Sequence, residues 1–255
     1  MQSLLPHQQK VLQFFDQLAS TYATRYAEEQ PYLQYWFETR LHNALAGQNF
    51  LGKNILDIGA GSGALYQTLS TRFASFDYTA TDLSAAMLAH SNIPSEKHRI
   101  GDIQDWTDVE NSFDHIFMLG LVSYLEPADF LNHLAWAGQY LHSGGTLCIS
   151  FTNKSSWDFR LRQLLRPLAR VLPGRGVVQQ GFSIQAHAIE EVQSLVQKMG
   201  FRIQQTTFLA PSVPFLQYLS PNLAATCARH LNQYLGDSIW RRWLSPDFLL
   251  HLVPA

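Results

Sequence analysis

The chain has 255 residues, of which 46% are hydrophobic and 15% are charged, and its formal net charge is −2. The length suits one large domain with a sizeable core, and the near-neutral charge excludes the clearly basic footprint typical of nucleic-acid binding. Because the charged fraction lies well below the usual ~25%, we expect apolar surface beyond the core. Such surface would face a greasy substrate, a partner subunit or a membrane.

The cysteines and histidines indicate neither a disulfide scaffold nor a metal site. Cys148 and Cys227 are the only cysteines, and their spacing matches no zinc motif. Cys148 lies in an apolar run and is interpreted as a buried structural thiol. The ten histidines lack the spacing of metal ligands, so no metal is expected.

The sequence also lacks the marks of export or membrane insertion. Its N-terminus has no basic region followed by a continuous apolar core, and no run approaches the ~18 apolar residues of a spanning helix. We therefore expect a cytoplasmic protein.

The first half of the chain predicts helices followed by a doubly wound sheet. Residues 1–50 have helical periodicity, with a second helix from about Pro31, which suits a first turn, to Gly47, which suits a stop. Short apolar strands are then predicted at about 53–58, 76–82, 96–101, 112–119 and 145–151. Helices are predicted between them, at about 63–73, 84–91 and 127–142, the last closed by Gly144 and Gly145. This alternation is typical of a parallel sheet covered on both faces.

After residue 151 the alternation breaks. The segment 152–182 holds five arginines and no strand periodicity, and its apolar residues from Trp157 onward fall on one helical face. Pro167 is expected to kink or divide that helix. We interpret the segment as an arm that closes over a greasy acceptor, with membrane contact through 157–176 or ordinary packing on the sheet as alternatives.

The remaining elements complete the predicted fold. A helix is expected at about 185–199, a strand at 201–209, a helical segment at 211–246 and a last strand at 247–253. No internal repeat is present.

A glycine-rich turn organises the chain. The apolar run Asn54–Ile58 leads into Gly59, Gly61 and Gly63, and a helical pattern follows. Glycines at alternate positions allow a ligand to approach the backbone, and the helix behind them offers unpaired N–H groups. Asp57 stands just before the turn, where a carboxylate would repel a pyrophosphate but favour a ligand with an ammonium or sulfonium centre.

Two further acids follow the next strands. Asp82 comes about twenty residues after the glycines, the spacing at which an acid reaches ribose hydroxyls. Asp102 is followed by Ile103, so the carboxylate could accept from an exocyclic amine while the aliphatic side chain packs on the ring. Because carboxyl ends of parallel strands share one edge of the sheet, the three acids are expected to surround one ligand.

In combination these motifs resemble the class I S-adenosylmethionine-dependent methyltransferases. The resemblance is carried by Leu56–Gly63, Ala80–Ser84 with Met87, Gly101–Ile103, Phe113–Tyr124 and Leu141–Leu147. It implies an α/β fold, with a Rossmann-like doubly wound sheet of seven strands whose last strand is antiparallel, in a domain over 51–255. It also implies S-adenosyl-L-methionine as cofactor and methyl transfer to a small-molecule acceptor.

The N-terminal region resembles the helical lid of the quinone-methyltransferase-like branch. In that branch an arginine upstream of the glycine turn holds the carboxylate of the donor, and Arg40 stands in a similar place. The cofactor-binding residues that the resemblance implies are Arg40, Asp57, Gly59, Ala60, Gly61, Ser62, Gly63, Asp82, Leu83, Met87, Asp102, Ile103 and Leu119. The substrate pocket is expected to include Tyr22, Tyr26, Tyr124 and Trp157.

No residue is identified as a general base. Methyl transfer from a sulfonium depends mainly on aligning the lone pair of the acceptor. We expect the acceptor to be an apolar or aromatic molecule that is methylated on oxygen or nitrogen. Two other functions remain open at this point: a catalytically silent donor-binding partner subunit, and an NAD(P)-dependent oxidoreductase. Asp57 and the Gly-x-Gly-x-Gly spacing argue against the oxidoreductase.

Overall fold

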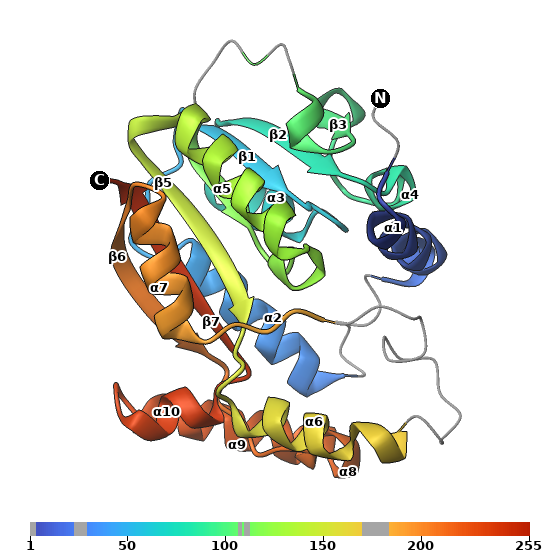
Figure 1. The fold of residues 1–255 in the computed structure, drawn as a ribbon, viewed down its shortest axis with the longest axis vertical. Coiled ribbons are helices and arrows are strands. Elements are labelled where there is room, and N and C mark those ends of the chain that lie inside the picture. Colours follow the sequence, from blue (N-terminus) through green and yellow to red (C-terminus); the bar gives the residue numbers. More distant parts are fainter. Residues whose placement is uncertain (1–3, 23–29, 107–108, 110–112, 170–183) are drawn as a thin grey trace.

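The computed structural model describes residues 4–22, 30–106, 109, 113–169 and 184–255, and gives only the backbone of residues 166–169. Its centre is a seven-stranded sheet in the order β3-β2-β1-β4-β5-β7-β6 (Figure 1). The strands are β1 Asn54–Ile58, β2 Asp77–Asp82, β3 His98–Ile100, β4 Phe113–Met118, β5 Leu141–Thr152, β6 Phe201–Leu209 and β7 Asp247–Pro254. Strands β1 to β5 run parallel, and β7 is antiparallel to both β5 and β6. The predicted sheet and its reversed last strand are confirmed.

Helices cover both faces of this sheet (Figure 1). They are α1 Pro6–Leu18, α2 Pro31–Ala44, α3 Ala64–Arg72, α4 Ala85–Ala89, α5 Pro127–Tyr140, α6 Trp157–Ala169, α7 Ile189–Lys198, α8 Leu216–Leu219, α9 Pro221–Tyr234 and α10 Ile239–Leu244. One core packs the sheet against α5 and α7, and the other packs it against α2, α3 and α4. Burial on both faces explains why the central strands are apolar runs rather than alternating ones.

Two predicted helix boundaries are wrong. Helix α5 ends at Tyr140 rather than at about residue 142, and Gly144 and Gly145 belong to β5 instead of stopping the helix, because Leu141 already pairs with Phe113 at the start of that strand. Gly145 is therefore a strand residue, and a Cβ there would lie 2.7 Å from the carbonyl oxygen of Asp114. The glycine permits close approach of two strands and does not stop a helix.

The second error concerns α7, which begins at Ile189 rather than near residue 185. The amide of Gln185 donates to the carbonyl of Ser123 at 2.8 Å, and that of His187 donates to the carbonyl of Thr152 at 2.9 Å. These bonds hold 185–187 extended beside the end of β5.

The arm after β5 is partly described. β5 continues to Thr152, and α6 runs from Trp157 to Ala169 without the division expected at Pro167. The rest of the predicted arm, from residue 170 to 182, lies outside the described residues.

One smaller interpretation is confirmed. Cys148 is 1% exposed, and burial raises the pKa of its thiol, so it is a packed side chain. His115 is buried beside Thr146, its Nδ1 lying 2.7 Å from the hydroxyl oxygen. Of the helices in the described ranges, none has both the length and the apolar character needed to cross a bilayer.

A separate group of helices lies beyond the carboxyl end of β5. Figure 1 shows α6, α8, α9 and α10 gathered at one end of the molecule, next to α2. Helix α9 packs on α2 through Ala224, Ala225 and Ala228, which surround Tyr32. These helices lie beyond the carboxyl ends of the strands, the end of the sheet at which the site described below is found.

Candidate active site

The glycine turn has the backbone conformation that the sequence predicts. Gly59, Gly61 and Gly63 have φ of 75°, 55° and 78°, in the left-handed region where side chains are disfavoured. Gly63 forms the N-cap of α3, and a Cβ there would meet Ile93 at 2.8 Å. The turn thus requires glycine both for its backbone angles and for its close packing.

Asp82 holds this turn in place. Its Oδ2 accepts from the amide of Gly61 at 3.0 Å, and its Oδ1 accepts from the amide of Ser84 at 2.9 Å. Ser84, not Asp82, is the N-cap residue of α4 and accepts from the amide of Met87. Burial raises the pKa of Asp82, although these two amides oppose the shift.

Asp57 lies on the other side of the turn and is 3% exposed. Tyr78 donates its hydroxyl to Oδ2 of Asp57 at 2.6 Å. Burial raises the pKa of Asp57 from 3.8 to about 7, the hydroxyl of Tyr78 opposes this shift, and the nearby charge of Asp82 adds to it. A cationic group beside Asp57 would favour the ionised carboxylate. Sequence reasoning missed Tyr78.

A small pocket of about 100 Å³ lies between α1, α4 and the ends of the first strands. It brings together eight of the predicted cofactor residues, which are Gly59, Gly61, Asp82, Leu83, Met87, Asp102, Ile103 and Leu119. Helix α1 forms its outer wall through Val11, Leu12 and Phe15. A further tie to α1 comes from Ser84, which donates its hydroxyl to Asp16 at 2.5 Å.

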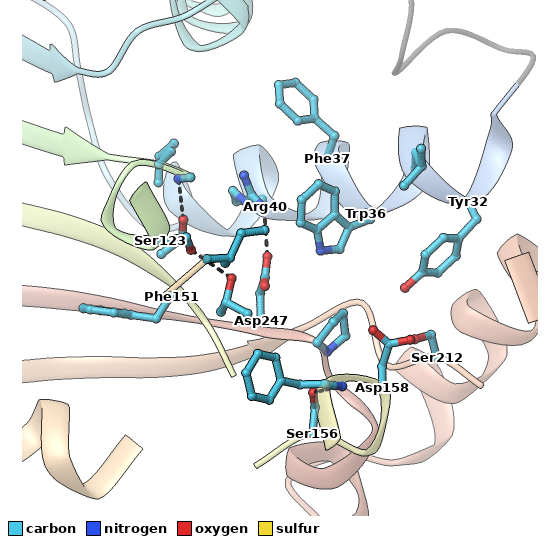
Figure 2. Close-up of a pocket in the computed structure, with 18 of the residues that line it drawn as sticks. Tyr32, Trp36, Phe37, Arg40, Ser123, Phe151, Ser156, Asp158, Ser212 and Asp247 are labelled. Atoms are coloured by element: carbon cyan, nitrogen blue, oxygen red, sulfur yellow. Dashed lines mark hydrogen bonds and ion pairs between the residues drawn. The ribbon is translucent and has the colours of Figure 1, made fainter. Parts of the chain in front are cut away.

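Next to it lies a large cavity of about 590 Å³, walled by α2, the ends of β4 and β5, and the helices beyond. Its lining is rich in aromatic side chains: Tyr22, Tyr32, Trp36, Phe37, Tyr124, Phe151, Phe159, Phe215 and Tyr218. Figure 2 shows Tyr32, Trp36 and Arg40 on α2, with Asp158 and Asp247 across from them. A cavity of this volume, lined by aromatic side chains together with polar ones, is typical of a small-molecule site.

The small pocket and the large cavity adjoin at the glycine turn and the end of β4. Six residues line both: Tyr22, Gly59, Gly61, Leu119, Gly120 and Tyr124. A ligand that occupies the small pocket can therefore reach into the large cavity past the turn. Asp57 lines the large cavity at this point, together with Ala60 and Ser62.

Apart from Asp57, the charged groups that line the large cavity in the described chain are paired with one another. Arg40 donates through Nη2 to Oδ2 of Asp247 at 2.8 Å, and both side chains are buried. Arg162 donates to both carboxylate oxygens of Asp158, at 2.5 and 3.1 Å, and to the hydroxyl of Tyr218 at 2.7 Å. Away from the glycine turn, this lining thus presents neutral ion pairs.

Two predicted site residues, Trp157 and Gly63, are not placed as expected. Trp157 is 43% exposed and packs edge-on against Trp240, so it does not line the cavity. The reason is helical phase: Asp158, Phe159 and Arg162 face the cavity, and Trp157 lies on the other side of α6. Gly63 caps α3 without lining either space. Tyr26 lies outside the described residues.

Residues of the cavity that sequence reasoning missed include Tyr32, Trp36 and Asp247. The first two precede Arg40 by eight and four residues, so the three share one face of α2. That spacing could have indicated that Tyr32 and Trp36 lie beside Arg40. Nothing in the sequence indicated Asp247, because its partner Arg40 is 207 residues away in the chain.

A doubly wound seven-stranded sheet with this glycine turn, an acid at the end of β2 and a reversed last strand defines the class I S-adenosylmethionine-dependent methyltransferases. The profile of a methyltransferase domain family matches residues 26–206. The chain belongs to this family. No match is found among curated proteins.

Solved structures of methyltransferases share the fold. Magnesium protoporphyrin IX methyltransferase from Synechocystis, solved with bound SAH, has a TM-score of 0.58 at 14% identity, covering 96% of this chain and 99% of its own. The N-methyltransferase NodS from Bradyrhizobium japonicum, with S-adenosyl-L-homocysteine, has a TM-score of 0.60 at 12% identity, covering 96% and 98%.

A third structure is a complex from Haloferax volcanii. It contains the Trm112 methyltransferase activator, and the matching chain has a TM-score of 0.64 at 15% identity, covering 94% of this chain and 97% of its own. At these identities the likeness establishes the fold and not the acceptor.

Proposed function

We propose that this protein transfers the methyl group of S-adenosylmethionine to the oxygen or nitrogen of a small, apolar or aromatic acceptor. The observation that carries the proposal is the junction of the small pocket with the large aromatic cavity. A donor held in the former would present its sulfonium at the glycine turn, facing an acceptor in the latter.

The donor end is supported by the positions of the acids. Asp82 and Asp102 flank the small pocket, where they would accept from the ribose hydroxyls and from the amine of adenine, with Ile103 and Met87 against the ring. Asp57, near the junction, would face the ammonium of the methionine moiety. Arg40 would hold the carboxylate through Nη1, which points at Gly120 while Nη2 is bound to Asp247.

The acceptor class follows from the lining of the large cavity. Its aromatic walls favour an apolar or aromatic molecule, and the pairing of Arg40 with Asp247 and of Arg162 with Asp158 disfavours one of high net charge. In-line displacement needs the acceptor lone pair aligned behind the methyl group, which close walls provide. Helix α6 contributes Asp158 and Phe159 to these walls and would cover the acceptor.

Calorimetry followed by a turnover assay tests the proposal. We expect the donor and S-adenosylhomocysteine to bind and NAD(P) not to bind. Labelled methyl should then pass to members of a panel of phenols, aromatic amines and hydroxylated apolar molecules. Donor binding without turnover on any acceptor would favour a silent partner subunit, and absence of donor binding would overturn the assignment.

A further inference from the structure

The helices beyond β5 carry an unusual share of exposed apolar side chains. Ten of the sixteen large hydrophobic residues that are exposed in the described part of the chain belong to α6, α8, α9 and α10. They are Trp157, Leu161, Leu164, Leu165, Tyr218, Leu219, Leu223, Tyr234, Ile239 and Trp240, and we refer to them as the apolar layer. Exposed apolar side chains gathered at one end of a molecule mark an interaction site.

The four helices lie together in one layer, with side-chain contacts between them. Trp157 of α6 contacts Trp240 of α10 edge-on, with ring centroids 6.1 Å apart. Arg162 of α6 donates to the hydroxyl of Tyr218 of α8 at 2.7 Å. Figure 1 shows all four helices at the same end of the molecule. Side chains exposed on them are therefore presented together.

Helix α9 buries one face against α2 and exposes Leu223 near its start, among exposed polar residues. Ala224, Ala225 and Ala228 pack on α2, whereas Leu223 is 51% exposed. Leu219, on the adjoining α8, is 84% exposed. Neither leucine lines the cavity, so the fold of the monomer gives no account of why they are apolar.

The charge of the layer is strongly positive although the chain as a whole is negative. Helices α6, α8, α9 and α10 contain six arginines and one aspartate, a net charge of +5, against −2 for the whole chain. Two of the arginines are ion-paired, Arg162 with Asp158 and Arg242 with Glu190 of α7. Arg160 and Arg229 are exposed. An apolar surface that also carries exposed arginines, with tryptophan and tyrosine among the apolar residues, complements an anionic lipid interface.

The large cavity opens beside this layer. Four of its lining residues are also exposed large hydrophobics, which are Leu165, Ile184, Val213 and Tyr218. Two of them, Leu165 and Tyr218, are members of the apolar layer. The mouth of the cavity is therefore continuous with the surface that carries the positive charge.

We infer that the apolar layer docks on the surface of an anionic lipid bilayer and holds the mouth of the cavity against it. An acceptor dissolved in the lipid would then enter the cavity without crossing water. Docking follows from the surface alone, whereas this route for the acceptor rests on the proposed function.

Vesicle flotation with the full-length protein tests the docking. Vesicles of phosphatidylcholine are compared with vesicles that also contain phosphatidylglycerol. We expect binding to the anionic vesicles, much weaker binding to the neutral ones, and loss of binding at high salt because the electrostatic part is screened. Binding to neither kind, or binding that ignores lipid charge and salt, would overturn the proposal.

Paired variants locate the contact. Leu219→Ser with Leu223→Ser should weaken binding to anionic vesicles about tenfold, since two insertable side chains are lost. The control is Leu51→Ser, at a residue 56% exposed before β1, near the opposite end of the strand from the cavity. Equal effects of the two changes, or a concentration-dependent dimer that only the double variant abolishes, would overturn the assignment to lipid.

Donor calorimetry on the same variants separates this inference from the proposed function. Leu219 and Leu223 lie outside the small pocket and the large cavity. Their replacement should leave donor affinity and turnover of a water-soluble acceptor within about twofold of the parent. Lost vesicle binding with these values retained supports docking, while unchanged vesicle binding refutes it and leaves the proposed function standing.

Discussion

Arg40 and Asp247 lie 207 residues apart in the chain, and their side chains form a buried ion pair with Nη2 2.8 Å from Oδ2. The guanidinium also stacks over the ring of Trp36, 4.0 Å from its centroid. Burial raises the pKa of Asp247 even though Arg40 opposes the shift. The pair joins α2 to the first residue of β7, which lies beside the carboxyl end of β5. It therefore connects one wall of the cavity to the sheet.

Breaking this pair should be costly. Asp247→Ala leaves a buried guanidinium without its counter-charge, and we expect a loss of about 3–5 kcal/mol in the free energy of unfolding. Urea denaturation followed by tryptophan fluorescence measures it. The control is Lys154→Ala, which removes an exposed ion pair to Glu191 and should cost less than about 1 kcal/mol. Similar losses for both would show that burial does not strengthen the Arg40 pair.

Asp57 should make stability and donor binding respond to pH in opposite directions. Its pKa is raised from 3.8 to about 7 in the fold. Between these values the folded state keeps a proton that the unfolded chain has released, so this group lowers stability as pH rises through that window. In the proposed function the ionised carboxylate of Asp57 faces the ammonium of the donor, so donor affinity should rise over the same range.

Asp57→Asn tests both effects. The amide oxygen can still accept from Tyr78, but no buried charge forms, so the variant should be more stable than the parent at pH 8 by up to about 4 kcal/mol and equal to it near pH 4. Donor affinity should fall more than about tenfold. Thermal melts and calorimetry across pH give the two readouts, and a variant less stable than the parent at pH 8 would contradict the assignment.

Asp82→Ala should weaken donor binding by more than about tenfold, roughly 1.5–3 kcal/mol, because a charge-assisted contact to two hydroxyls is lost. The change also removes the acceptor for the amide of Gly61. Calorimetry measures the affinity, and circular dichroism checks the fold. Asp77→Ala, at the other end of β2 and exposed, is the matched control and should bind the donor normally. Equal affinity of the two variants would refute the ribose assignment.

Gly61→Val should abolish donor binding while leaving the secondary structure near native. The residue has φ of 55° and lines both the small pocket and the large cavity. Gly47→Val is the control, since Gly47 has φ of 70° and no described atom lies within 4 Å of the place that a Cβ would take. Both variants should lose about 1–2 kcal/mol of stability from backbone strain, but only the first should lose the donor. Retained binding in Gly61→Val would mean that the turn does not face the ligand.

Phe159→Ala should separate the acceptor from the donor. Phe159 lines the large cavity and not the small pocket. We expect a fall of about tenfold in kcat/KM for the acceptor, with donor affinity within a few-fold of the parent. Leu164→Ala, on the same helix but 73% exposed, should leave turnover of a soluble acceptor unchanged. A variant of Phe159 with normal turnover would show that α6 does not shape the acceptor site.

The small pocket, which we propose binds the donor, was predictable from sequence because its signals are local. Gly59 to Gly63 follow an apolar strand directly, and Asp82 and Asp102 each follow the next strand at a regular interval. Parallel strands then bring these residues to one edge, as the small pocket has them. Fold and donor residues therefore come from the same periodic pattern.

The acceptor half was less predictable because it depends on distant pairs and on helical phase. Trp157 and Phe159 are two residues apart on α6, and periodicity alone did not tell which one faces the cavity. Asp247 meets Arg40 only through the sheet. Tyr78 bonds Asp57 from the neighbouring strand, at a position that reads as ordinary core. Gly145 shows the same limit. In the sequence, a glycine after a helical segment looks like a helix stop, whereas in the structure it allows close approach to the backbone of Asp114 in the neighbouring strand.

The order of the chain has a consequence for how acceptor choice can change. Residues that line the small pocket all fall between Val11 and His133. The cavity walls beyond β5 come from two inserts, one between β5 and α7 and one between β6 and β7. Both inserts start and end at the same edge of the sheet. Exchanging them between relatives would therefore leave the small pocket, which we propose binds the donor, unchanged. Chimeras that swap only residues 153–188 and 210–246 should therefore change which acceptor is methylated and leave donor binding unchanged.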